Sequence, residues 1–239
     1  MVKTIFGTEI KLDNIKEYTA RAILTPKNEY VHEINKKILN LLEGECKTYY
    51  SIDSLVDADG EDEANYPIEF LNSVNISGLP LHELKLKVGA MARLMRNLNK
   101  KQGLCNGTRI LIKALKPNVI HAEVLTGKAK GQEILIPRID LLPSDSNNDF
   151  PFILKRRKFP IMLAFAMTIN KSQGQSFLYV GIFLPAPVFS HGQLYVAFSR
   201  GKNKRNVKVK VLDTQKQGKL LPGSPKVFTY NCVYKEIFA

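Results

Sequence analysis

The sequence has no tryptophan, three cysteines, four histidines and no long apolar run. The cysteines, Cys46, Cys105 and Cys232, are far apart and odd in number, so they predict neither a disulfide framework nor a zinc site. We expect no metal ligands and a reducing compartment such as the nucleus, cytosol or an organelle matrix. Residues 161–167 are apolar throughout but far too few to cross a bilayer. The first residues lack the hydrophobic core of a signal peptide, so no membrane partner is expected.

A phosphate-binding loop is also lacking. Such a loop follows the pattern Gly-x-x-x-x-Gly-Lys-Ser/Thr, in which backbone amides and the lysine hold the phosphates. The Gly-Lys pairs begin at Gly127, Gly201 and Gly218, and none has the earlier glycine or the following hydroxyl residue. No strand ends in an acidic pair suited to magnesium, and the histidines form no nucleophilic set with serine or cysteine. We therefore expect no ATP hydrolysis by this chain alone.

What the chain has in excess is positive charge. Its 239 residues carry a formal net charge of +13, while 44% are hydrophobic, which indicates a globular protein with a sizeable core. A balance this basic favours nucleic acid as a partner, although surface charge that serves only solubility is the alternative. The basic run 155–158 is open to three interpretations: a nuclear-import patch, a phosphate contact or a solvated face.

The first part of the chain alternates strand and helix. Residues 21–25 predict a buried strand that Pro26 ends. Apolar residues on one helical face then predict a helix from Glu29 to Glu43, with Asn28 as its N-cap. The acidic segment 53–65 resembles a calcium loop only in composition. Its spacing fails, because no glutamate closes the loop, so a solvated loop is the prediction.

The middle of the chain has a sequence pattern typical of β-strands. Residues 108–115, 119–126 and 132–139 are short and rich in Ile, Val and Leu, and turn sequences separate them. Short strands at this spacing predict an antiparallel module inserted into the α/β domain. The pattern of the α/β domain resumes at 161–167, which predicts one strand buried on both faces.

Further elements follow this run. Residues 178–184 predict a second buried strand, Ser190 with Gln193 forms a capping-box pattern that starts a helix, and 207–212 alternate as a half-exposed strand. His191 falls in the first turn of that helix, where a structural role is expected. After Gln215 the tail is rich in Gly, Pro and Lys and ends in a strand-like segment.

The chemistry is expected in two places. The turn from Thr168 to Gly174 follows a buried strand, where open α/β sheets bind ligands, and its hydroxyl, amide and amine groups suit phosphodiester oxygens. Arg200 ends the capped helix and could aim its guanidinium at a γ-phosphate. The plain alternatives are a polar loop and an arginine that complements the helix dipole. We expect the Thr168 turn and Arg200 to lie at the same edge of one parallel sheet.

At these residues the sequence resembles the petite-integration-frequency (PIF-type) family of DNA helicases, and within it the Helitron-like plant branch. The blocks that carry the resemblance are RAILTPKNEYVHEIN, YPIEFLNS, GLPLHELKLKVG, RNLNKKQGLCNGTRI, FPIMLAFAMTINKSQGQS, FSHGQLYVAFSR and NCVYKEIF. The resemblance implies a superfamily-one, 5′-to-3′, ATP-dependent DNA helicase that acts with Mg²⁺ in DNA repair, recombination and telomere maintenance, in the nucleus or, alternatively, the mitochondrion.

The resemblance also implies domains and site residues. It divides the chain into a second RecA-like domain, an inserted SH3-like β-barrel and a tail, at residues 14–83 with 158–214, 84–157 and 215–239. It implies single-stranded DNA contacts by Thr25, Pro26, Asn28, Thr168, Asn170, Lys171 and Ser172. It implies an ATP-facing turn at Gln173, Gly174 and Gln175, and it makes Arg200 the arginine finger.

Some positions depart from the family pattern. Some members have arginine at the position of Asn28, a frequent histidine is replaced by Asn170, and residues 89–92 depart from the usual Gly-x-Pro-Val run. The first RecA-like domain, with its phosphate loop and magnesium motif, is missing from the sequence and would have to act in trans or in a longer chain. A DNA-binding module without catalysis and a decayed transposon fragment are the rival interpretations.

Overall fold

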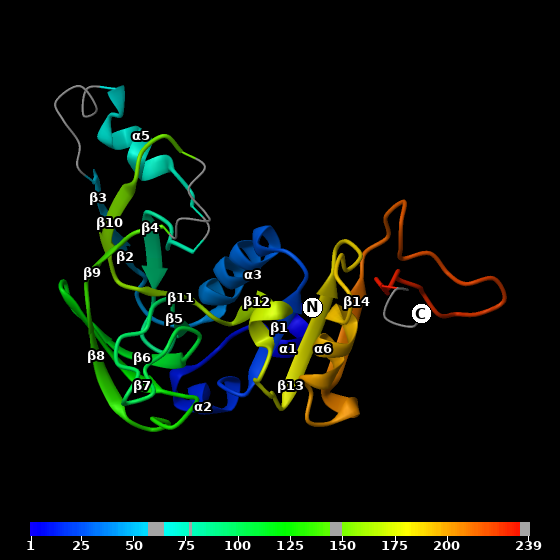
Figure 1. Cartoon of the computed structure of the whole chain (residues 1–239). Helices are drawn as coiled ribbons and strands as arrows, with labels where there is room; N and C mark the ends of the chain where they lie inside the picture. Colours follow the sequence, from blue (N-terminus) through cyan, green and yellow to red (C-terminus); the bar gives the residue numbers. More distant parts are fainter. Residues whose placement is uncertain (57–64, 77, 144–149, 235–239) are drawn as a thin grey trace. The chain divides into compact units, whose positions relative to one another are not determined.

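The computed structural model describes residues 1–56, 65–76, 78–143 and 150–234 (Figure 1). Within it the chain forms two compact units, Met1–Glu43 with Ala164–Ala239, and Gly44–Leu163. Most of the acidic segment 53–65 lies outside the described residues. Its first residues are not loop, however, because Ile52–Leu55 form strand β3.

The first unit contains a four-stranded parallel sheet. Its strands are β1 (Arg21–Thr25), β12 (Ala166–Thr168), β13 (Tyr179–Leu184) and β14 (Val207–Val211), in the order β12-β1-β13-β14. Three of these confirm the strands expected at 21–25, 178–184 and 207–212. The expectation of one strand at 161–167 was wrong. Its first residues form β11 (Ile161–Leu163) in the other unit, and only its last two belong to β12.

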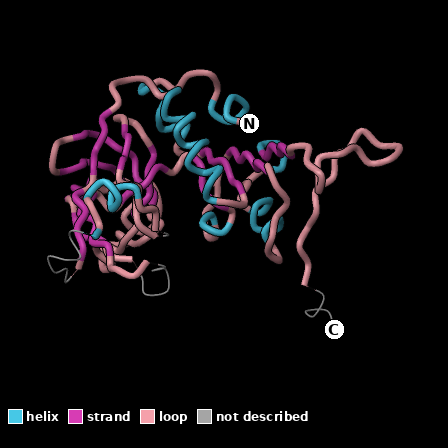
Figure 2. The backbone as a smooth tube through the Cα atoms, turned by 90° about the horizontal axis from the view of Figure 1, so that it is seen from above, coloured by secondary structure: helices cyan, strands magenta, loops and turns pink. Residues whose placement is uncertain are grey.

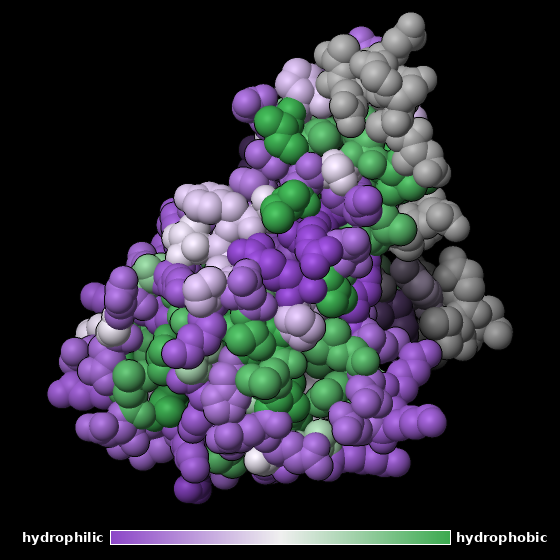
Figure 3. Space-filling model, turned by 90° about the vertical axis from the view of Figure 1, so that its left-hand side faces the viewer, coloured by the Kyte–Doolittle hydropathy of each residue, from purple (hydrophilic) through white to green (hydrophobic). Residues whose placement is uncertain are grey.

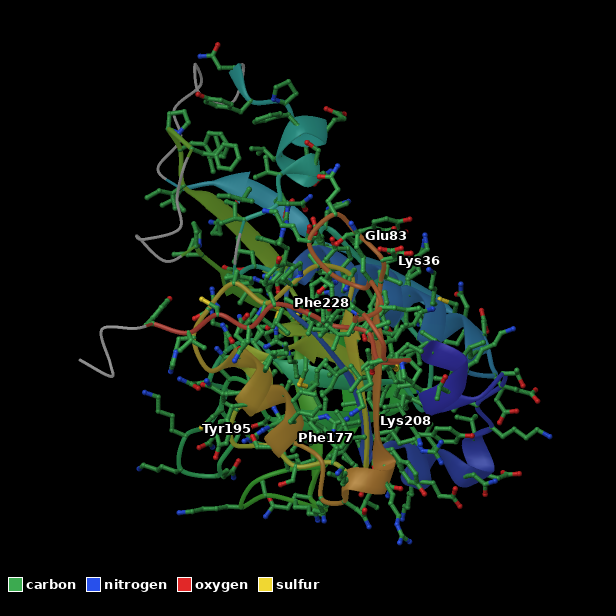
Figure 4. The ribbon with its side chains drawn as sticks, turned by 90° about the vertical axis from the view of Figure 1, so that its right-hand side faces the viewer. Lys36, Glu83, Phe177, Tyr195, Lys208 and Phe228 are labelled. Carbon is green, nitrogen blue, oxygen red and sulfur yellow. The ribbon has the colours of Figure 1, made fainter. Side chains whose placement is uncertain are left out.

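Helices cover both faces of the parallel sheet. Helix α1 (Val2–Phe6) and helix α3 (Asn28–Leu41) contact one face. Helix α6 (Gln193–Ser199) packs on the opposite face, where Ala197 joins a core with Leu24 and Ile182. Figure 4 shows Phe177, a member of this core, beside α6. Burying these apolar side chains contributes roughly 1.5–3 kcal/mol for each large one, so this packing holds α6 against the sheet.

The helix ends differ in detail from the expectation. Asn28 is the first residue of α3 rather than its cap, and Lys27 occupies the cap position without a side-chain hydrogen bond. Helix α6 begins at Gln193, after Gly192, so His191 precedes it. The Gln193 side chain still reaches back, but its Oε1 accepts from the backbone N–H of Phe189 rather than from that of Ser190. The apolar face of α3 was predicted correctly, with Val31, Ile34 and Ile38 buried, because it depends on periodicity and not on the cap.

Short helices and the tail complete this unit. The short helices are η1 (Leu12–Asn14), α2 (Ile15–Tyr18), η3 (Asn170–Ser172) and η4 (Lys204–Asn206). The described part of the tail is loop rather than strand (Figure 2). It is anchored by buried Gln217, whose Nε2 donates to the Leu184 carbonyl at 2.7 Å. Further along, the Tyr234 N–H donates to His191 Nδ1, which gives His191 the structural role expected of it.

The second unit is the antiparallel module. A five-stranded sheet has the order β11-β5-β6-β7-β8, a second sheet the order β3-β10-β9, and β2 pairs with β4. The remaining bounds are β2 (Lys47–Tyr50), β4 (Glu83–Leu86), β5 (Met91–Leu94), β6 (Arg109–Leu115), β7 (Val119–Val124), β8 (Glu133–Pro137), β9 (Ile139–Leu141), β10 (Leu154–Lys158) and α5 (Ile68–Ser73). Strands β6, β7 and β8 confirm the three expected strands.

This compact unit, Gly44–Leu163, includes more residues than the predicted insertion 84–157. The predicted boundaries give residues 44–83 and 158–163 to the α/β domain. In the structure β2 bonds to β4, β3 to β10 and β11 to β5, so their hydrogen bonds lie within the module. An SH3-like barrel remains a prediction; what the structure shows is the antiparallel sheet.

The basic run 155–158 is not a continuous exposed patch. It forms β10, the central strand of its sheet, and side chains on a strand point alternately to opposite faces. Arg156 and Lys158 are fully buried, and only Lys155 and Arg157 reach solvent. The Arg156 guanidinium donates to both carboxylate oxygens of buried Asp53, from Nη2 at 2.7 Å and from Nε at 2.9 Å. Half of this run is therefore part of the module's core.

Candidate nucleic-acid and nucleotide site

The carboxyl edge of the parallel sheet brings the first group of predicted residues together. Thr25 and Thr168 are paired at the ends of β1 and β12, and α3 and η3 begin just beyond them. Asn28 and Lys171 lie close enough for Lys171 Nζ to donate to Asn28 Oδ1 at 3.2 Å. Residues far apart in the sequence thus form one polar group at this edge.

Their accessibility divides the predicted DNA-binding residues into two classes. Asn28, Asn170 and Lys171 are exposed, whereas the others are buried: Thr25, Pro26, Thr168 and Ser172. Ser172 Oγ donates to the Ile169 carbonyl at 2.6 Å, so this hydroxyl stabilises the turn. The exposed amide and ammonium groups are therefore the ones that can contact a ligand directly.

Two functional side chains were not predicted. Buried Asn35 in α3 accepts the Ala166 N–H at 2.8 Å and donates to the Ala166 carbonyl at 3.0 Å, which satisfies the outer edge of β12. Gln193 donates from Nε2 to Asn170 Oδ1 at 3.3 Å and fixes that amide. A signal existed for Asn35, because an amide within the apolar face of a helix requires a buried polar partner.

Arg200 does not lie at the carboxyl edge, so the expectation of a single shared edge was wrong. The residue after it, Gly201, forms a parallel bridge with Phe177, which precedes the first residue of β13. This is the amino edge of the sheet, where Arg21 pairs with Tyr179. A helix that follows a parallel strand runs back across the sheet, so the end of α6 lies at the opposite edge from Thr168.

Arg200 is half-buried and holds the neighbouring turn. Its Nε donates to the Val196 carbonyl at 3.0 Å, Nη1 to the Gln175 carbonyl at 3.0 Å and Nη2 to Ser199 Oγ at 2.8 Å. A guanidinium has further N–H donors beyond these, so the group can still bind an anion.

The segment 173–175 connects the two edges. Gln173 and Gly174 are exposed, and Gly174 has a φ of 74°, a left-handed conformation that glycine adopts without strain. Gln175 Nε2 donates to the Lys171 carbonyl at 3.3 Å, while its own carbonyl accepts from Arg200. Three hydrogen bonds, joined through the covalent structure of Lys171 and Gln175, therefore link Asn28 to Arg200.

The described residues contain no group of three His, Cys, Asp or Glu side chains that could hold a metal ion. Among the helices of the described ranges, none is long and apolar enough to span a bilayer.

Comparison with known proteins defines the class of this chain. Residues 69–115 match the family model described as the 2B domain of DNA helicase Pif1. A crystal structure of Bacteroides Pif1 bound to ssDNA aligns with a TM-score of 0.59 and 23% identity, over 85% of this chain and 48% of that one. Pif1 helicase from Candida albicans aligns with a TM-score of 0.60 and 22% identity, over 81% and 45%. The α/β fold with its parallel sheet and antiparallel module is thus the fold of Pif1 helicase structures.

Individual relatives narrow the assignment. The chain is 29% identical over 194 residues to the ATP-dependent DNA helicase PIF1 of Xenopus laevis, covering 81% of this chain and 28% of the relative. It is 30% identical over 207 residues to ATP-dependent DNA helicase Pif1 of Campylobacter jejuni, covering 83% and 43%. The chain is therefore similar to the C-terminal region of Pif1-family DNA helicases, 2B domain included, and spans less than half the length of these relatives.

Proposed function

We propose that this chain is the strand-binding half of a 5′-to-3′ ATP-dependent DNA helicase. In this proposal the carboxyl edge of the parallel sheet binds single-stranded DNA, and Arg200 at the amino edge completes an ATP site. A first RecA-like domain, in the same chain or in trans, supplies the phosphate loop and the magnesium ligands. The single observation that carries the proposal is the hydrogen-bonded path from Asn28 and Lys171 through Gln175 to Arg200.

Contacts at the carboxyl edge suit a DNA backbone. The Lys171 ammonium and the amides of Asn28 and Asn170 are exposed, and such groups donate to phosphate oxygens without reading sequence. Gln193 and Asn35 hold this polar group in place, the first through Asn170 and the second through β12. An edge that is rigid and basic binds many sequences with similar affinity, as a translocating motor requires.

In this proposal Arg200 acts as the arginine finger. It stands at the end of a helix that packs on the sheet, and its bonds to Val196 and Gln175 orient the guanidinium. A fixed guanidinium stabilises the charge that develops on a transferring phosphoryl group. Because Gln175 also touches the Lys171 carbonyl, movement of the DNA strand at one edge can shift Arg200 at the other.

Finer assignments belong to the same proposal. We place the chain in the Helitron-like plant branch on the sequence blocks that resemble it, and assign it roles in DNA repair, recombination and telomere maintenance. A nuclear location follows from those roles, with the mitochondrion as the alternative. The solved Bacteroides Pif1 complex with ADP-AlF3 and ssDNA, 25% identical to this chain, supports ATP and single-stranded DNA as the ligands of the whole protein.

Replacing Lys171 with glutamine tests whether the carboxyl edge of the parallel sheet binds single-stranded DNA. We expect Lys171→Gln to weaken binding of an oligothymidylate to the purified chain, and to reduce the slope of log affinity against log salt by about 0.7, because one phosphate contact is lost. Fluorescence anisotropy across a salt series measures both quantities. The control is Lys130→Gln, an exposed lysine in a turn of the module. If Lys171→Gln behaves like this control, the carboxyl edge does not bind DNA as proposed.

A further inference from the structure

A cleft in the antiparallel module is lined by none of the predicted DNA-binding or ATP-binding residues, although Arg157 of the basic run 155–158 is part of its lining. Its volume is about 470 Å³, and its lining includes Tyr50, Ser51, Asn118, Arg138 and Arg157. These residues come from the end of β2, the turn between β6 and β7, the start of β9 and strand β10. Two guanidinium groups, an aromatic ring, an amide and a hydroxyl therefore line one small cleft.

The aromatic ring in the lining, that of Tyr50, is exposed and can stack on a ligand. Alternation along β2 buries Tyr49 and turns Tyr50 outward, which leaves Tyr50 56% exposed. Its ring lies 5.4 Å from the ring of His82, centre to centre, at an interplanar angle of 37°. The neighbouring Ile52 is also exposed and lines the same cleft. An exposed ring beside an aliphatic side chain gives a flat apolar surface next to two cations.

The guanidinium groups are held in different ways. Arg138 Nη1 donates to the Tyr50 carbonyl at 2.7 Å, and its guanidinium lies 4.8 Å from the centre of the Phe159 ring, so its position is fixed. Arg157 is more exposed, and its Nη1 lies 3.5 Å from Asp140 Oδ1. A fixed and a more mobile guanidinium together suit an anion with several oxygens, because each can offer a pair of donors.

Positive charge also exceeds negative charge behind the cleft. Arg156 is neutralised by Asp53, whereas Lys158 donates only to the carbonyls of Leu81 and His82 among its hydrogen bonds. Burial, and then the positive charges of Arg156 and Arg138, lower the pKa of Lys158 to about 7, although Asp53 and Glu83 oppose this shift.

The surface around the cleft is mixed in character. Figure 3 views the side of the molecule on which the module's strands β8 and β9 lie, and it shows apolar areas among hydrophilic side chains. Within the module, Leu135 is 67% exposed on the edge strand β8, and Ile52 is 65% exposed in β3. A ligand that combines negative charge with flat apolar faces complements such a surface.

We propose that this cleft binds one nucleotide unit of a single-stranded nucleic acid, with its phosphate between Arg138 and Arg157 and its base on the Tyr50 ring. The inference rests on the proposed function in taking the same class of ligand, but it places a second contact in the module. Stacking on an aromatic ring accepts any base, and guanidinium groups bind any backbone phosphate, so the cleft is indifferent to sequence. A phosphopeptide would use the cations but would leave the Tyr50 ring without a stacking partner.

Two exposed residues test the cleft without disturbing the core. We expect Tyr50→Ser to weaken binding of an oligothymidylate to the whole chain by about 5- to 150-fold, the range for loss of one stacked base. We expect Arg157→Gln to lower the salt slope by about 0.7. The matched controls are Tyr230→Ser, 58% exposed in the tail, and Lys130→Gln. Anisotropy titrations give affinities and slopes, and thermal melting shows that each variant is folded.

The outcomes separate this inference from the proposed function. If Lys171→Gln weakens binding while both cleft variants match their controls, the proposal that the cleft binds a nucleotide is overturned, and the proposal that the carboxyl edge binds DNA is supported. If the cleft variants weaken binding and Lys171→Gln does not, nucleotide binding by the cleft is supported and DNA binding by the carboxyl edge is overturned. If a phosphoserine peptide binds the wild-type chain as tightly as the oligothymidylate does, and Arg157→Gln weakens its binding while Tyr50→Ser does not, the cleft recognises phosphate alone and the assignment to nucleic acid is overturned.

Discussion

Replacing Arg200 with alanine is expected to reduce ATP hydrolysis by about 10³- to 10⁵-fold in kcat, the range for loss of an arginine finger. The measurement uses this chain joined to a first RecA-like domain that carries a phosphate loop, with saturating ATP and single-stranded DNA. Arg200 is the only predicted site residue that lies at the end of α6, and its guanidinium is already oriented by Val196 and Gln175. Its loss should therefore affect the chemical step far more than DNA binding.

The same variant loses hydrogen bonds that stabilise the turn, so its stability has to be measured beside its activity. Each such bond contributes about 1 kcal/mol, which lowers the melting temperature without unfolding the chain. Arg205→Ala is the matched control, because Arg205 is an exposed arginine on η4, near the same edge of the sheet. Normal hydrolysis by a folded Arg200→Ala protein would show that Arg200 only caps its helix.

The second large effect is expected in the core of the module. Asp53→Asn should lower the free energy of unfolding by about 3–5 kcal/mol, because it leaves the buried guanidinium of Arg156 without a compensating charge. Replacing both partners with apolar residues, as in Asp53→Leu with Arg156→Met, should restore much of that stability. Denaturant titration followed by circular dichroism measures the differences.

Strand β10 supplies the control for this prediction. The next residue, Arg157, pairs with Asp140 at 3.5 Å, but both side chains are about half exposed. Exposed pairs contribute about 0–1 kcal/mol, so Asp140→Asn should change stability little. If Asp53→Asn and Asp140→Asn destabilise the chain equally, the buried pair does not have the role in the core assigned to it.

Periodicity predicted much of the fold. Strand β1, helix α3 and strands β6, β7 and β8 follow from the spacing of apolar residues, because each buries one face or stripe. It could not show that the apolar run 161–167 contributes to two different sheets, because an apolar residue carries no information about its partner. Nor could it show that Arg156 is buried, since this depends on Asp53, which lies far away in the sequence.

The candidate site was predicted in composition but not in arrangement. The residues of the Thr168 turn do gather with Asn28, because parallel strands end at one edge. Arg200 was placed at the wrong edge, although the return of a helix after a parallel strand would have predicted the amino edge. The roles of Gln175 and Gln193 as connecting residues depend on side-chain directions, which one sequence does not reveal.

The central claim is that one edge of the sheet binds DNA and communicates with Arg200 through Gln175. Amide hydrogen exchange of the purified chain, with and without an oligothymidylate, tests it most directly. The account predicts slower exchange at residues 169–175 when DNA is bound, and also at the Phe177 amide, which donates to the Arg200 carbonyl. Unchanged exchange at 169–175 in a sample saturated with the oligonucleotide would contradict it.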